Sequence, residues 1–67
     1  MKVPAHVQRM LDEADELDTR YEALHKFIKD NPVFETLPEI DKMLLRNQRK
    51  HMAGYLTVLN MRIERAG

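Results

Sequence analysis

Apolar side chains recur at alternating spacings of three and four residues through the first half of this 67-residue chain. The series consists of Val7, Met10, Ala14, Leu17, Tyr21, Leu24 and Ile28. Residues spaced in this way occupy the a and d positions of successive heptads, so they form one continuous stripe along an α-helix. The chain is therefore expected to contain a long helix that packs lengthwise against another helix.

Proline residues mark both ends of this first helix. Pro4 suits the first turn, because its fixed φ is helical and its missing N–H would have no acceptor within the helix. Pro32 disfavours the helical conformation at Asn31, the residue before it. We therefore expect a helix over about 4–30 and a link over 31–35.

The second half of the chain opens with the spacing of a capping box, in which Thr36 is followed three residues later by Glu39. A second helix is expected over about 37–65. The link before it carries Val33 and Phe34, which we expect to fold back and close the end of the core. Two helices of about 40 Å each, joined by a short link, form an antiparallel αα-hairpin, so the fold class is all-α.

Apolar residues cover more of the second helix than one partner helix can bury. They span an arc of roughly 220°, whereas contact with one helix uses about 100° to 140°. The chain has no cysteine, so disulfides cannot stabilise its small core. We therefore expect residues 1–67 to form a single domain that assembles into a homo-oligomeric helical bundle, a dimer or a tetramer. The expected interface residues are Leu45, Met52, Leu56, Leu59, Met43 and Met61.

Charge is unevenly divided although the whole chain is neutral. Acidic residues outnumber basic ones by seven to four over 5–30, and basic residues outnumber acidic ones by six to three over 36–67. A neutral chain is not expected to bind DNA or RNA in general, since that affinity comes from an excess of Lys and Arg. The asymmetry has two interpretations, either pairing of the two helices or a local anion site.

Several classes of function lack their signatures in this sequence. There is no glycine-rich phosphate loop, no cysteine or serine, and no His-Glu-x-x-His zinc pattern, so we expect no enzymatic activity, no metal and no cofactor. No stretch approaches the roughly 20 apolar residues that span a bilayer, and the start lacks the apolar core of a secretory signal. The chain is expected in the cytoplasm, without a membrane partner.

The densest polar segment runs from Arg46 to His51 and is followed by Tyr55. Arg and Lys side chains give charge-assisted hydrogen bonds to phosphate, and His or Tyr rings stack on bases. These residues do not share one helix face, so only an oligomer with juxtaposed helices could gather them around a ligand. An equally good interpretation of Gln48 and Tyr55 is a hydrogen-bonded layer that fixes the register of a bundle core.

A set of residues in a characteristic order extends from about Asp15 to Ile63. It consists of Glu16-Leu17-Asp18, Leu24, Phe27-Ile28, Phe34, Leu37, Leu44-Leu45-Arg46-x-Gln48, Met52, Tyr55, Leu59 and Arg62-Ile63. In these residues the chain resembles a family of very small helical-hairpin proteins of phages and prophages. Its architecture also resembles the phage anti-CBASS sponges, which are helical oligomers that bind the cyclic oligonucleotide signals of bacterial immunity and sequester them without cleavage.

The second resemblance implies a cyclic dinucleotide held at a subunit interface, and a cyclic di- or trinucleotide is the expected partner. Arg46, Arg49 or Lys50 would face its phosphates, and Tyr55, His51 or Tyr21 would stack on its bases. Two alternatives remain open at this point. The spare apolar arc of the second helix could dock against a helix of another protein, as in an adaptor or an inhibitor of a host enzyme, or the role could be purely structural.

Overall fold

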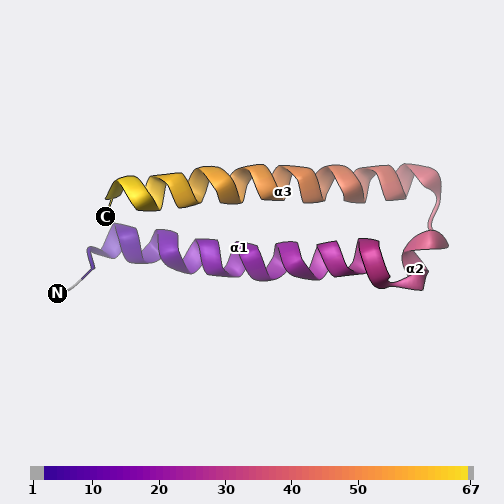
Figure 1. Ribbon diagram of the computed structural model, residues 1–67, viewed down its shortest axis with the longest axis horizontal. Coiled ribbons are helices and arrows are strands. Elements are labelled where there is room, and N and C mark those ends of the chain that lie inside the picture. Colours follow the sequence, from indigo (N-terminus) through magenta and orange to yellow (C-terminus); the bar gives the residue numbers. More distant parts are fainter. Residues whose placement is uncertain (1–2, 67) are drawn as a thin grey trace.

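The computed structural model describes residues 3–66, which form two long antiparallel α-helices joined by one short helical segment (Figure 1). The long helices are α1, Ala5–Asp30, and α3, Glu39–Ala66, and the short one is α2, Pro32–Glu35. The principal extents of the chain are 50 × 16 × 13 Å. The all-α hairpin is therefore confirmed. Met1, Lys2 and Gly67, which the sequence places in the same single domain, lie outside the described residues.

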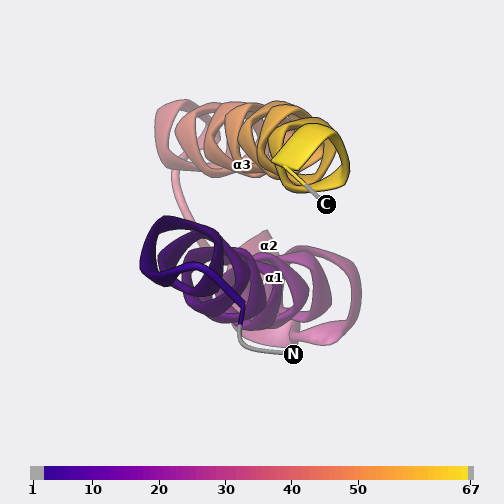
Figure 2. The same ribbon diagram turned by 90° about the vertical axis from the view of Figure 1, so that its left-hand side faces the viewer.

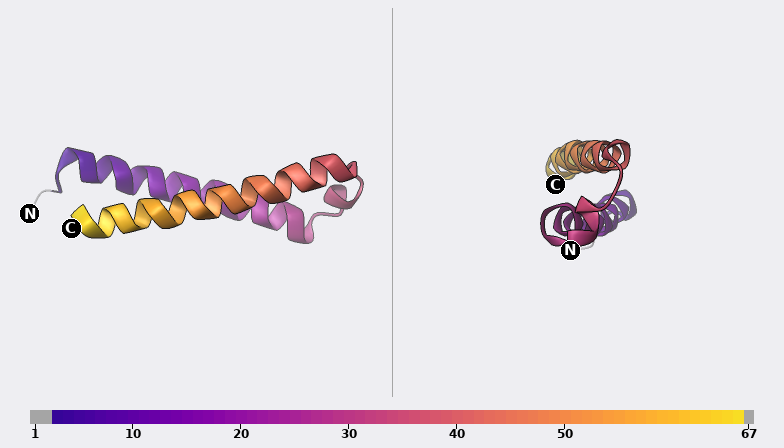
Figure 3. Two further views of the ribbon diagram at one scale, coloured as in Figure 1. Left: turned by 90° about the horizontal axis from the view of Figure 1, so that it is seen from above. Right: turned by 90° about the vertical axis from the view of Figure 1, so that its right-hand side faces the viewer.

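The heptad stripe of α1 is the side of that helix that packs against α3. None of its seven residues is exposed, and Val7 is among the buried residues of the chain. Helices α1 and α3 run alongside each other over their length (Figure 1), the end-on view shows one above the other (Figure 2), and the view from above shows them crossing at a shallow angle (Figure 3). This geometry is typical of helices whose 3-4 repeats interlock.

A matching stripe on α3 faces α1 and has the same spacing. Its members, all buried or half-buried, are Lys42, Leu45, Arg49, Met52, Leu56, Leu59 and Ile63. Leu59 is the most deeply enclosed, with 0% of its surface exposed. Each long helix therefore contributes one seven-residue stripe to a narrow core that extends over the length of the hairpin.

The link between the long helices is ordered by its own hydrogen bonds. The Asn31 side chain accepts a hydrogen bond from the backbone N–H of Val33 at 2.9 Å and caps α2. Phe34 is only 1% exposed and meets Phe27 edge to face at 6.0 Å between ring centroids, so it closes the core as expected. Val33 is 53% exposed, and the expectation that it also folds inward is wrong.

The helix expected from about Leu37 begins two residues later, at Glu39. Pro38 disfavours the helical conformation at Leu37, which explains the later start. The Thr36 hydroxyl donates a hydrogen bond to the carbonyl oxygen of Val33 at 2.6 Å, at the end of α2. Thr36 thus ends the short helix instead of capping the long one.

Candidate functional site

Helix α3 has a second apolar side that points away from α1. Of the nine large apolar side chains that are exposed in residues 3–66, six lie on α3, against one, Leu11, on α1. These six are Ile40, Met43, Leu44, Tyr55, Val58 and Met61, of which Tyr55 lies at the edge toward α1. The broad apolar arc of the sequence is therefore divided into a buried half against α1 and an exposed half on the opposite side.

We call this exposed side the outer face. Its centre line consists of Ile40, Leu44, Asn47, His51, Gly54, Val58 and Met61, which repeat the 3-4 spacing and are all exposed. Such spacing is typical of a stripe that packs against a further helix. On a solvated hairpin the same positions would ordinarily be polar. The outer face is therefore the candidate functional site.

The outer face is apolar at both ends and polar or small in its middle. Asn47, His51 and Gly54 occupy the middle. A Cβ atom built on Gly54 has no neighbouring atom within 4 Å, so the packing of the hairpin does not require a glycine there. A glycine that costs helix stability without easing any contact inside the chain is consistent with close approach of something outside it.

The six predicted ligand-binding residues do not lie together. Lys50, His51 and Tyr55 are exposed, and all three lie on or beside the outer face. Arg46 is exposed as well, but its guanidinium carbon lies 5.2 Å from the centroid of the Phe34 ring, in a cation–π arrangement. Part of the basic charge of α3 is therefore used at the closed end of the hairpin.

Lys42 is the clearest case of a base used inside the fold. It is 8% exposed, and its Nζ lies 3.4 Å from a carboxylate oxygen of Glu35 and 3.4 Å from one of Glu39. The same ammonium is 5.9 Å from the centroid of the Phe34 ring. Burial of this charge is compensated by two carboxylates and a ring face, so Lys42 stabilises the turn and leaves no charge for a ligand.

Arg49 and Tyr21 lie inside the hairpin, away from the outer face. The Arg49 guanidinium donates to Nδ1 of His25 at 3.2 Å, and the His25 ring stacks on Tyr21 at 6.0 Å and 15°. The three side chains form a half-buried polar layer between α1 and α3. His25 was not among the predicted residues. It lies four residues after Tyr21, on the same side of the helix, and this spacing is the signal by which the sequence could have identified it.

The predicted interface residues are divided in the same way. Leu45, Met52, Leu56 and Leu59 lie on the side of α3 that packs against α1, whereas Met43 and Met61 are exposed on or beside the outer face. The structure adds three exposed apolar residues that the predicted interface omitted, namely Ile40, Leu44 and Val58. These three residues lie on one side of the helical wheel, opposite Leu45 and Leu56, and this shared position was the signal available in the sequence.

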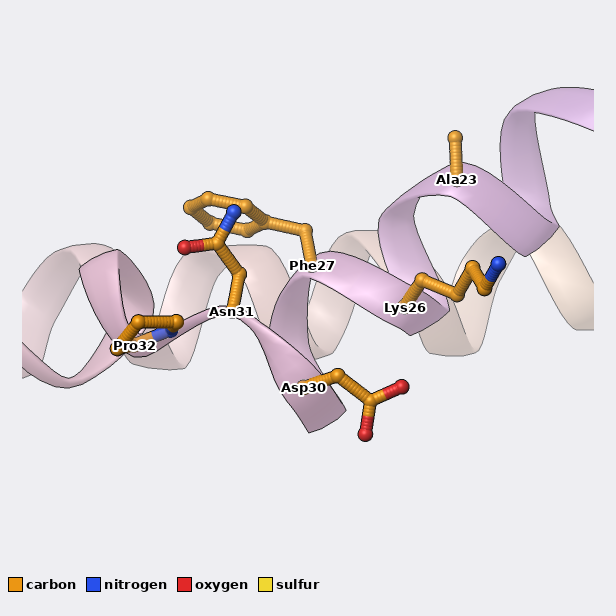
Figure 4. A pocket seen from close by; sticks show the side chains of 6 residues that line it. All are labelled: Ala23, Lys26, Phe27, Asp30, Asn31 and Pro32. Atoms are coloured by element: carbon orange, nitrogen blue, oxygen red, sulfur yellow. The ribbon is translucent and has the colours of Figure 1, made fainter.

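Two hollows lie elsewhere on the described surface. One is an open depression at the end of α1, lined by Ala23, Lys26, Phe27, Asp30, Asn31 and Pro32 (Figure 4). It holds one base and one carboxylate, without net charge to attract an anion. The other is lined by Glu13, Glu16, Leu17, Arg20 and Tyr55, and its one base is paired with Glu16 at 2.6 Å. Neither hollow is suited to a phosphate.

Residues 3–66 contain neither a cluster of metal-binding side chains nor a helix suited to crossing a membrane. No group of three or more His, Cys, Asp or Glu side chains is placed to hold a metal ion. Neither long helix, nor the short one between them, combines the length and apolarity needed to cross a membrane.

Comparison with known proteins gives a match to a family model. No curated protein and no solved structure matches the chain. The family model described as Sequestin matches residues 4–65, which include all three helices except Ala66 at the end of α3. The name suggests a sequestering role. On the strength of a match over nearly its whole length, the chain belongs to the Sequestin family.

Proposed function

We propose that this protein is a non-enzymatic oligomer that binds and sequesters a cyclic oligonucleotide immune signal in the cytoplasm of a phage-infected bacterium. Membership in the Sequestin family supports the sequestering role. The resemblance to anti-CBASS sponges supports the cyclic oligonucleotide as ligand.

The outer face of α3 is the observation that carries this proposal. Copies that pack through its apolar ends would enclose its polar middle, with Asn47 and His51 between them and Lys50 and Tyr55 at the rim. An ammonium group binds phosphate, and the rings stack on bases. A ligand site of this kind exists only between copies, because one hairpin presents its middle flat to solvent.

Sequestration requires affinity and copy number but no chemistry. A bound signal is inactive only while its dissociation constant lies below its working concentration, so we expect Kd values below about 10 μM. Self-association of a 67-residue chain is compatible with the large copy number that stoichiometric binding needs.

The experiment combines light scattering after size exclusion with thermal melts in the presence of cyclic di- and trinucleotides. One ligand is expected to raise the Tm, since ligand at 100 times its Kd adds about 2.7 kcal/mol to the folded state. Lys50→Ala should reduce this shift. Lys29→Ala, which removes another exposed lysine, from α1, should leave it unchanged. An oligomer indifferent to every cyclic nucleotide contradicts the proposal.

A second candidate is supported by the exposure of the outer face in the isolated hairpin. Five exposed apolar side chains on one helix side, with Tyr55 at its edge, also suit docking against a helix of a host protein. This candidate predicts a monomer in solution and capture of one defined host protein, with capture abolished by Leu44→Glu. A concentration-independent oligomer would contradict it, because the face would already be covered.

A further inference from the structure

The outer face of α3 has a similar pattern when it is followed in either direction. Two apolar residues, Ile40 and Leu44, precede the polar middle, and two more, Val58 and Met61, follow it. We infer that a second copy of this chain covers the outer face with its own α3 antiparallel, giving a four-helix bundle with a two-fold axis through the polar middle. The inference deepens the proposed function and rests on it for the identity of the ligand.

Antiparallel pairing matches the apolar ends of the two copies. Ile40 and Leu44 of one copy would lie against Met61 and Val58 of the other, and the same contacts recur on the far side of the axis. Such an interface is isologous, because the same patch serves both copies. It also closes, so no apolar residue of the centre line is left to recruit a third chain.

The charges beside the outer face select antiparallel over parallel pairing. Asp41, Gln48, Tyr55 and Arg62 recur at intervals of seven residues along one flank of the centre line, and all four are exposed. In the antiparallel dimer, Asp41 of each copy faces Arg62 of the other. Parallel pairing would place the two copies of this flank on opposite sides of the interface, so neither Asp41 nor Arg62 would meet an opposite charge from the same flank of the other copy. Within residues 3–66, no ion pair already engages either residue.

The same flank pairs Gln48 of one copy with Tyr55 of the other. A side-chain amide and a phenolic hydroxyl are complementary hydrogen-bonding groups, so this pair would fix the register at two symmetric points. A hydrogen-bonded layer that fixes register is one of the interpretations of Gln48 and Tyr55 in the sequence. In this dimer that layer lies between the two copies and not inside one hairpin.

The polar middle becomes a site to which both copies contribute. Asn47 and His51 of each chain would border the two-fold axis, where Gly54 allows the helices to approach closely. A two-fold site binds one ligand per two chains. It favours a cyclic dinucleotide, whose two halves are equivalent in backbone, over a cyclic trinucleotide, which lacks a two-fold axis through its ring.

The absence of cysteine allows a direct test by disulfide trapping. Leu44→Cys and Val58→Cys are made separately, and the purified variants are oxidised alone and as a mixture. The two positions are 14 residues apart, about 21 Å along a helix. A disulfide needs Cα atoms within about 7 Å. The antiparallel dimer therefore gives crosslinks in the mixture and few in either variant alone. Thr19→Cys, on an exposed part of α1, should not crosslink with either variant.

Crosslinking of Leu44→Cys with itself, or no crosslinking in the mixture, would overturn the inference. The experiment uses no nucleotide, so its failure is distinct from failure of the proposed function. If the wild-type protein binds a cyclic nucleotide but the mixture of cysteine variants does not crosslink, the antiparallel register is refuted and the proposed function stands. If the mixture crosslinks in the expected register but the wild-type protein binds no cyclic nucleotide, the antiparallel dimer is supported and the cyclic nucleotide is refuted as its ligand.

Discussion

Replacing Leu59 by alanine should remove most of the stability of the hairpin. The side chain is 0% exposed in the stripe between α3 and α1, and truncation of a buried leucine costs about 2 to 5 kcal/mol. A core of this size supplies only about 3 to 5 kcal/mol. We therefore expect Leu59→Ala to be largely unfolded at 25 °C, as measured by far-ultraviolet circular dichroism in urea and in thermal melts.

Leu44→Ala is the matched control, because it makes the same chemical change on the same helix at a position 56% exposed. At low protein concentration it should cost no more than about 0.5 kcal/mol. At high concentration, where the proposed oligomer forms, it should weaken association. Wild-type stability in Leu59→Ala would refute the packing of α1 on α3. A large, concentration-independent loss in Leu44→Ala would show that the outer face is buried within one chain.

Three further sets of variants test separate contacts. Asp41→Arg and Arg62→Asp should each lower the oligomer mass measured by light scattering, and the double variant should restore it; equal effects of the single and double variants would contradict antiparallel pairing. Gly54→Ala should stabilise the dilute hairpin by up to about 1 kcal/mol through helix propensity, measured as a higher Tm, and should weaken association; a gain in both stability and association would remove the case for close approach. Phe34→Ala should cost about 3 to 5 kcal/mol in a urea melt, against a small effect of Val33→Ala; similar losses would contradict the closed end of the core.

The hairpin could be predicted from the sequence because its strongest signals are local. The 3-4 spacing of α1 admits only one buried stripe, and all seven of its residues are unexposed in the structure. Pro32 and Pro38 interrupt the helical conformation on either side of the link, which limits where the second long helix can begin. Such constraints act between neighbouring residues, so they do not depend on tertiary contacts.

The orientation of α3 could not be predicted in the same way. Its apolar arc is wider than one contact surface, and Leu45 and Leu44 are equally suited to packing against α1. The side that does pack includes Lys42 and Arg49, which a hydrophobic pattern excludes from a core. Their burial depends on Glu35, Glu39 and His25, and only the folded chain brings these partners within reach.

The same limit applied to the candidate ligand site. Arg49 and Tyr21 have the chemistry to bind a nucleotide, but the structure places both in a polar layer with His25. Residue type and spacing do not distinguish a base that is paired inside the fold from one that faces solvent. Lys50, His51 and Tyr55 remain as the exposed members of the predicted set, and Asn47 joins them through its place on the outer face.

Isothermal titration of the wild-type protein with a cyclic dinucleotide measures whether the protein sequesters such a signal, and the linear dinucleotide and a cyclic trinucleotide serve as comparison ligands. We expect saturable binding with a Kd below about 10 μM, one ligand per two chains, and recovery of the ligand intact after the protein is denatured. Absence of heat and of any Tm shift with every cyclic nucleotide, from a protein shown to be folded and oligomeric, would contradict this expectation.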